Sequence, residues 1–114
     1  LESLVVRTLL IFLWLTAAAC ASPTLQPVGR WKIFHSDGRP IFVQVSADGR
    51  CVSPGENQKG TWKLENGSLT FTWSDGWKDV IQYHQGRLIK LGFGPGVPVS
   101  AKAVNQTAAF KLRR

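Results

Sequence analysis

Cysteine is scarce in this 114-residue chain, which contains only Cys20 and Cys51. Two cysteines cannot build a zinc site, and no group of His and Cys residues has the spacing of zinc ligands. They also exclude a disulfide-rich scaffold, because they allow a single Cys20–Cys51 bridge that needs an oxidising compartment. Without that bridge, Cys51 is expected to be a small core residue. We therefore predict no metal and no cofactor.

Acidic residues are also few: 7 Asp and Glu stand against 14 Lys and Arg, which gives a formal net charge of +7. Such a charge attracts anionic neighbours over distance and is screened by salt, although it also serves solubility alone. The bases are scattered along the chain rather than gathered in one run. Anionic lipid or glycan is therefore the predicted partner, and nucleic acid is not, because the N-terminal residues described next predict export. The oligomeric state stays open.

A long apolar run is lacking as well. Arg7 precedes a short apolar stretch, residues 8–15, and small residues follow it in Thr16-Ala17-Ala18-Ala19. These are the three parts of a secretory signal peptide, and the apolar stretch is well short of the roughly 20 residues that a membrane-spanning helix needs. We predict a signal-peptide helix over residues 1–19 and hence an exported protein of the bacterial envelope.

The residues Ala17-Ala18-Ala19-Cys20 resemble the lipobox of bacterial lipoproteins, in which small residues precede a lipidated cysteine. The chain departs from that pattern at Ala17, where leucine is usual. The resemblance implies that a lipidated Cys20 anchors the protein to a membrane surface, with residues 20–28 as a tether. Ordinary cleavage at an Ala-x-Ala site is the alternative, and it would give a periplasmic or secreted protein.

Regular turn signals punctuate the remainder. Asp-Gly and Asn-Gly dipeptides favour tight hairpins because both residues tolerate positive φ, and short segments rich in β-branched and aromatic residues lie between them. The fold class is all-β: a single antiparallel meander of about seven strands, curled into a sandwich or a small barrel. The predicted strands cover residues 29–35, 40–47, 50–53, 60–65, 68–74, 77–84 and 87–93.

Alternation along these strands predicts which face each one buries. Residues 68–74 place Leu69, Phe71 and Trp73 on one face, and residues 87–93 place Ile89, Leu91 and Phe93 on one face. The β-sheet domain is expected to cover residues 29–104, including one edge strand at 99–104. Residues 105–114 are predicted to be a loosely attached basic tail.

The strands also show a weak internal repeat. Gly29-Arg30-Trp31-Lys32 and Gly60-Thr61-Trp62-Lys63 each open a three-strand block. With the hairpin Trp73-Ser74-Asp75-Gly76-Trp77 and the following Asp79-Val80-Ile81, residues 29–98 resemble a group of small exported bacterial proteins, largely uncharacterised. The resemblance implies a β-sheet domain and an envelope address, and no established activity.

Candidate acid–base groups do not converge in the sequence. His35 and His84 both end predicted strands. Either histidine could act as a base for Cys51 as a nucleophile if the fold brought them together. No flanking motif of a thiol enzyme surrounds Cys51, so we predict that the protein is not an enzyme; a hydrolase using His35, His84 and Asp79 is the least favoured hypothesis. Asp79 falls on an apolar face and needs a turn, an arginine or a ligand as partner.

Aromatic residues complete the candidate binding set. Core packing accounts for most of them, but they could also form a stacking surface for sugar rings or a pocket floor for a small apolar ligand. We predict a non-catalytic envelope domain that binds a protein, glycan or lipid, with a small apolar-ligand carrier as the alternative. The candidate binding residues are Trp31, Trp62, Trp73, Trp77, Asp79 and Tyr83.

Overall fold

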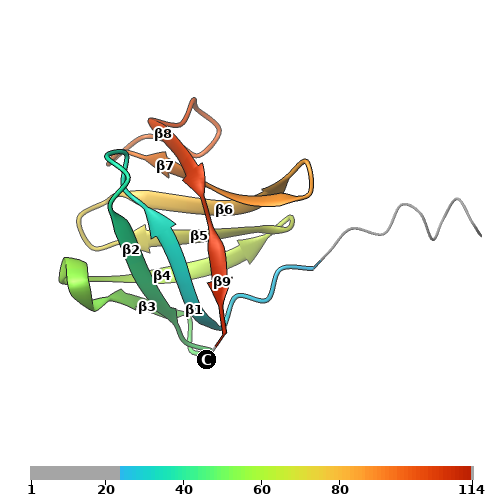
Figure 1. The fold of residues 1–114 in the computed structure, drawn as a ribbon. Helices are drawn as coiled ribbons and strands as arrows, with labels where there is room; N and C mark the ends of the chain where they lie inside the picture. The colour runs from blue at the N-terminus through green and yellow to red at the C-terminus, as the bar shows by residue number, and fades with distance from the viewer. Residues whose placement is uncertain (1–23, 114) are drawn as a thin grey trace, which may run out of the picture.

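The computed structural model describes residues 24–113, which form an antiparallel meander of nine strands (Figure 1). The strands are β1 (Gly29–Phe34), β2 (Pro40–Val45), β3 (Arg50–Ser53), β4 (Gln58–Glu65), β5 (Ser68–Trp73), β6 (Lys78–His84), β7 (Arg87–Phe93), β8 (Asn105–Ala108) and β9 (Phe110–Leu112). A short 3-10 helix, η1 (Pro54–Glu56), joins β3 to β4. The all-β class and the antiparallel meander are confirmed, and each of the seven predicted strands is present. The expected signal peptide, Cys20 and the start of the tether lie outside the described residues.

The hairpins form where the turn dipeptides predict them. At Asn66-Gly67 both residues take positive φ, 52° and 79°, as a tight two-residue hairpin requires. The Asp-Gly turns add a side-chain bond: Asp37 and Asp75 each accept a hydrogen bond from the backbone N–H two residues later. Such Asx turns give the chain a local reason to reverse at these places.

The last two strands bring the edges of the meander together. β8 pairs with β7, β9 pairs with β1, and only Ala109 separates β8 from β9. In Figure 1 these two strands (red) follow one another across the front of the molecule from β7 to β1. The nine-stranded sheet is therefore a nearly closed barrel rather than a two-sheet sandwich.

Two expectations about the C-terminal part are corrected by this closure. The segment 105–114 was expected to be a loose basic tail, but its residues 105–112 supply β8 and β9. The edge strand expected at 99–104 is absent, because these residues are turns and bends. The segment has little apolar alternation of its own, and its backbone groups become strand only because the edges of β7 and β1 offer them partners.

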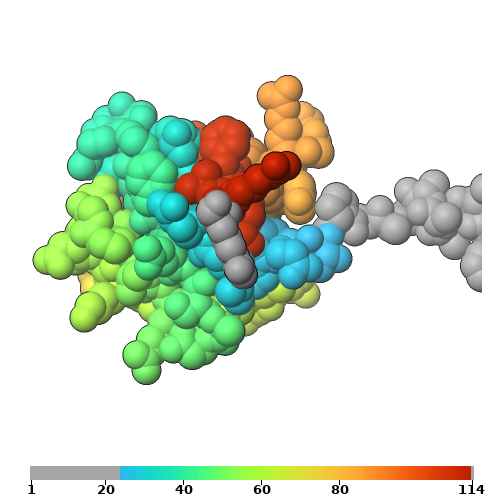
Figure 2. All heavy atoms as spheres, turned by 60° about the horizontal axis from the view of Figure 1, so that its bottom comes forward, coloured from blue at the N-terminus to red at the C-terminus, as the bar shows by residue number. Residues whose placement is uncertain are grey.

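The connections alternate between the two ends of the barrel, as they must in a meander. The β1–β2, β3–β4, β5–β6 and β7–β8 connections share one end, which we call the mouth. The opposite end carries the other three hairpins, and there the first described residues (blue) lie beside the last strand (red) in Figure 2. Leu25 belongs to the core cluster, and the Trp31 indole donates a hydrogen bond to the Pro27 carbonyl, 2.8 Å away. This end is therefore packed with side chains.

Inward-facing residues of the first six strands form the core. Trp31, Ile33, Val43, Leu69, Phe71 and Ile81 are all fully buried, and the register places Trp31 opposite Val43 and Leu69 opposite Ile81. The predicted inward face of residues 68–74 is thus confirmed. No helix within residues 24–113 is long and apolar enough to cross a membrane.

Ile89, Leu91 and Phe93 share one face of β7 as predicted, and Phe93 is buried, but this face is not the one turned into the barrel. Lys90 lies opposite Ile81 in the register, so Lys90 shares the inward face, and it is only 2% exposed. Ile89 and Leu91 consequently point outward and are half-buried. The interior next to β7 is polar because Asp79 of β6 also faces inward there.

Candidate functional site

A pocket of about 380 Å³ opens at the mouth of the barrel. Its volume falls within the range of about 300–1,000 Å³ that small-molecule sites occupy. Residues near the mouth connections contribute His35, Ser36, Glu56, Asp75 and Trp77. The inward faces below contribute Ile41, Ser53, Gln58, Trp73, Asp79, Lys90 and Asn105. The closed sheet thus gathers side chains from seven of its strands and from η1 around one hollow.

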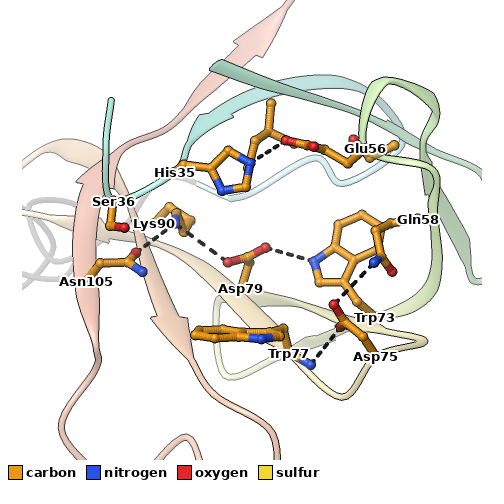
Figure 3. A pocket seen from close by; sticks show the side chains of 12 residues that line it. His35, Ser36, Glu56, Gln58, Trp73, Asp75, Trp77, Asp79, Lys90 and Asn105 are labelled. Atoms are coloured by element: carbon orange, nitrogen blue, oxygen red, sulfur yellow. Dashed lines mark hydrogen bonds and ion pairs between the residues drawn. The ribbon is translucent and has the colours of Figure 1, made fainter. Parts of the chain in front are cut away.

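Asp79 is at the centre of a chain of polar contacts (Figure 3). Its Oδ2 accepts a hydrogen bond from the Trp73 indole at 2.8 Å, and its Oδ1 lies 3.7 Å from the Lys90 ammonium. Lys90 also donates to Oδ1 of Asn105 at 2.7 Å. This chain links β5, β6, β7 and β8, so the strand that closes the barrel also completes the pocket.

Burial shifts both charged groups of this pair toward their neutral forms. Burial raises the pKa of Asp79 above its ordinary 3.8, although the Lys90 charge and the Trp73 hydrogen bond act against that rise. Burial likewise lowers the pKa of Lys90 below 10.5, while Asp79 partly offsets the change. The two groups therefore depend on each other to stay charged inside the barrel.

A second polar pair lies across the pocket. His35, just after β1, contacts Glu56 of η1 through its Nε2, and the Glu56 carboxylate is also 3.8 Å from the Arg39 guanidinium. The β1–β2 and β3–β4 connections are thereby tied together on one rim. Figure 3 places this pair on the side of the pocket away from Trp77.

Trp77 forms the aromatic wall. The Asp75 turn holds its backbone, since the Trp77 N–H donates to Asp75 Oδ1 at 3.1 Å, and Gln58 donates to the other oxygen of Asp75 at 3.2 Å. Figure 3 shows the indole edge-on below Asp79, with one flat face toward the hollow. At 38% exposure, this ring is open to a ligand on one side.

The hydroxyl oxygen of Ser53 is the one buried side-chain polar atom within residues 24–113 that lacks a hydrogen-bond partner. The residue is 1% exposed and lines the pocket. It stands at the N-cap of η1, but its side chain makes no capping hydrogen bond there. A buried hydroxyl without a partner costs about 1–3 kcal/mol, so a ligand that bonds to it recovers that cost.

The six predicted binding residues are divided by the fold. Trp73, Trp77 and Asp79 line the pocket. Trp31 is in the core at the packed end, Trp62 packs against the core and donates to the Ser46 carbonyl, and Tyr83 is exposed near the end of β6. Trp31, Trp62 and Trp73 share one sequence signal, an aromatic residue on the inward face of a strand, and their position along the barrel axis separates Trp73 from the other two.

Two pocket residues, Lys90 and Asn105, were not predicted from the sequence. The only sequence feature that indicated them was Asp79, a carboxylate on an otherwise apolar face that needs a charged or hydrogen-bonding partner. Its partner is a lysine on the next strand, and that lysine becomes inward-facing only through the β6–β7 register. Asn105 was assigned to the tail, and its place opposite Gly92 follows from the closure of the barrel.

Of the three acid–base groups considered for catalysis, only His35 and Asp79 come together, since both line the pocket. His35 is at the mouth, whereas His84 ends β6 at the opposite end of the barrel. Burial, with a smaller effect of the Asp79 charge, raises the pKa of the Cys51 thiol from 9.0 to about 12. That thiol donates weakly to the Thr61 carbonyl at 3.6 Å and stays protonated at neutral pH.

Within the described part of the chain, no group of three His, Cys, Asp or Glu side chains is placed to hold a metal ion. Comparison of the chain with protein-family models, with curated proteins and with solved structures gave no match. Any functional conclusion therefore depends on the pocket and its chemistry.

Proposed function

We propose that this chain is an exported, non-catalytic envelope protein that binds a small ligand at the mouth of its barrel. The observation that carries the proposal is the pocket of about 380 Å³ in which an open indole face meets several converging polar side chains. Concave sites with an aromatic wall and a few oriented polar groups are typical of ligand binding.

The arrangement of the reactive groups supports binding rather than catalysis. His35 is in contact with Glu56 at the mouth, His84 lies at the far end, and Cys51 holds its proton. A nucleophile needs a base within hydrogen-bond reach, and these three residues do not supply that pair.

The polar lining favours a polar ligand over the apolar one considered from the sequence. Asp79, Lys90 and Glu56 all border the pocket. An apolar molecule would remove water from these groups and return no hydrogen bonds, which carries a desolvation penalty. The long acyl chain of a lipid would also need the barrel interior, where Trp31, Ile33 and Phe71 fill the space.

A thermal-shift screen of the mature protein against a library of small polar molecules tests this proposal. A ligand that binds only the folded protein raises the unfolding free energy by about 2.7 kcal/mol when its concentration is 100 times its dissociation constant. The melting temperature rises as a result. We expect Trp77→Ala to abolish the shift and Tyr83→Ala to preserve it, since Tyr83 has nearly the same exposure, 40%, and lies outside the pocket. Hits that survive Trp77→Ala would place binding elsewhere and contradict the proposal.

We also propose that lipidation of Cys20 holds the barrel at a membrane surface. An outward patch supports this: Lys32 lies 5.5 Å from the ring centre of Phe34 and 6.0 Å from that of Phe42, and the Phe34 ring packs edge-on against Phe110. Phe42 and Phe110 are exposed. Aromatic rings beside a cationic group suit the headgroup region of an anionic membrane.

For the anchored protein, we expect Cys20→Ser to move it from the membrane fraction to the soluble fraction when it is expressed with its own leader in bacteria. Intact mass should show acyl groups on a chain that starts at Cys20 and none in the variant. A Cys51→Ser variant is the matched control, because Cys51 is buried in the barrel and should leave the fractionation unchanged. Equal membrane association of Cys20→Ser and the parent would exclude the anchor.

A further inference from the structure

We propose that the ligand of the barrel mouth is a neutral sugar, bound with its ring stacked on Trp77 and its hydroxyls bonded to Ser53, Asn105 and the Asp79–Lys90 pair. The inference rests on the proposed function, since it names the ligand class of the same pocket. Four features of the lining lead to it.

Charge is the first feature. Three carboxylates, Glu56, Asp75 and Asp79, border the pocket together with the Lys90 ammonium. Each carboxylate already has partners: His35 and Arg39 for Glu56, Gln58 and a backbone N–H for Asp75, and Trp73 and Lys90 for Asp79. An anion would meet three like charges, and a cation would meet Lys90 after displacing existing partners. A neutral ligand avoids both penalties.

Hydrogen-bonding capacity is the second feature. Ser53 Oγ is buried within the described barrel without a partner and can donate or accept. Asn105 uses Oδ1 for Lys90, and its amide nitrogen carries two further N–H donors. The carboxylate oxygens, by contrast, only accept. A hydroxyl group donates and accepts at once, so a ligand with several hydroxyls matches this mixture of partners without reorienting it.

The aromatic wall is the third feature. The Asp75 turn fixes the backbone of Trp77, and the indole presents a flat face below the polar groups (Figure 3). An aromatic face is electrically negative, whereas the C–H groups on the face of a sugar ring carry partial positive charge. A sugar therefore offers an apolar face to Trp77 and an equatorial rim of hydroxyls to the surrounding side chains.

Depth is the fourth feature. The pocket ends on Trp73 and Ile41, and the fully buried Phe71 and Ile33 lie beyond them in the core. The hollow therefore accepts a compact ring rather than an extended chain. Its open side allows a longer glycan to continue into solvent from a ring held at Trp77.

Isothermal titration with four related sugars tests the charge argument directly. The probes are D-glucose and N-acetyl-D-glucosamine, which are neutral, D-glucosamine, which is cationic, and D-glucuronate, which is anionic. D-Galactose and D-mannose extend the neutral set. We expect at least one neutral sugar to bind with a dissociation constant of about 1 mM or lower, a normal affinity for a single small site, and each charged analogue to bind at least several-fold more weakly.

Variants then separate binding from folding. Trp77→Ala should weaken the neutral sugar about tenfold or more, as loss of a stacking partner does elsewhere, whereas Tyr83→Ala should leave the affinity unchanged. Ser53→Ala should also weaken binding, yet the variant should unfold at the same temperature as the parent or higher, because it removes an unpartnered buried hydroxyl. A residue with a purely structural role would not combine these two effects.

Each outcome is decisive. If no neutral sugar binds while a charged sugar or an apolar probe such as toluene binds and requires Trp77, the sugar inference is wrong and the ligand-binding function stands. If sugars bind equally well to the Trp77→Ala variant, the inference is wrong as well. If neither the sugars nor any molecule of the polar library binds in a Trp77-dependent way, the proposed function itself is overturned.

Discussion

Deleting residues 105–114 is expected to abolish the cooperative native state of the barrel. The deletion removes β8 and β9, and with them every backbone pairing of the closing segment with β7 and β1. The deletion also removes Ala109 from the core and breaks the hydrogen bond between Lys90 and Asn105. It further removes the Lys111 ammonium, which lies 5.1 Å from the centre of the Trp31 ring. We expect a loss of more than about 4 kcal/mol, a large part of the roughly 5–15 kcal/mol that stabilises a domain.

Urea denaturation followed by Trp fluorescence and circular dichroism measures this loss. The newly unpaired edges of β7 and β1 should also cause concentration-dependent association in size-exclusion chromatography. Removing Arg113 and Arg114 alone is the matched control, because that change lowers the charge and leaves β9 in place. A native-like transition midpoint after deletion of 105–114 would mean that the segment is a dispensable tail.

Lys90→Met is expected to destabilise the protein by about 3–5 kcal/mol at pH 7, although methionine nearly matches the lysine stem in length. The Lys90 side chain is 3% exposed and that of Asp79 is 14% exposed, so the variant leaves a buried carboxylate without its cation. The double variant Asp79→Asn/Lys90→Met removes both charges and keeps an oxygen for the Trp73 indole. We expect its stability to lie within about 1 kcal/mol of the parent or above it.

The pH dependence follows from the directions of the two pKa shifts. Because burial raises the pKa of Asp79 above 3.8, its folded form binds a proton more tightly than its unfolded form, and stability falls as pH rises from 3.8 through the folded pKa. The pKa of Lys90 lies below 10.5, so stability rises again as pH approaches 10.5. Between these windows both groups are charged at a cost that their mutual attraction reduces.

Lys90→Met should make the stability of the protein depend more steeply on pH between pH 4 and pH 7. Without the ammonium, the pKa of Asp79 rises further, and the cost of the substitution should shrink as pH is lowered from 7 toward 4. Urea titrations of the parent, the two single variants and the double variant at both pH values give the coupling energy. An equal cost of Lys90→Met at pH 4 and pH 7 would show that Asp79 is not the group that requires Lys90.

Local chemistry allowed most of the strands to be predicted. The Asp-Gly and Asn-Gly turns lie within a few residues of the strands that they join, and the bonds that shape them reach two residues along the chain, as from Asp75 to Trp77. The alternation of Leu69, Phe71 and Trp73 likewise reports a buried face directly. The same reasoning placed Trp73, Trp77 and Asp79 among the candidate binding residues.

The closing strand and the identity of the pocket could not be predicted in this way. Residues 105–112 become strand because β7 and β1 leave two edges free, and the contact from Thr107 to the Phe34 carbonyl joins residues 73 positions apart. Alternation in residues 87–93 pointed to Ile89 and Leu91 as the buried face rather than to Lys90. Pairing with β6 reverses that choice, since Ile81 and Asp79 are already inward.

By itself, the sequence determined the all-β class, the hairpins and the strands from β1 to β7, because turn residues and alternation act over a few positions. The signal peptide over residues 1–19 and the lipidation of Cys20 stay predictions. Tertiary structure alone decided that the sheet closes, that Lys90 and Asn105 meet Asp79, and that Ser53 faces a hollow without a partner. The physical reason is that register and closure are set by backbone groups far apart in the chain, and a side chain becomes part of a site only when that pairing turns it inward.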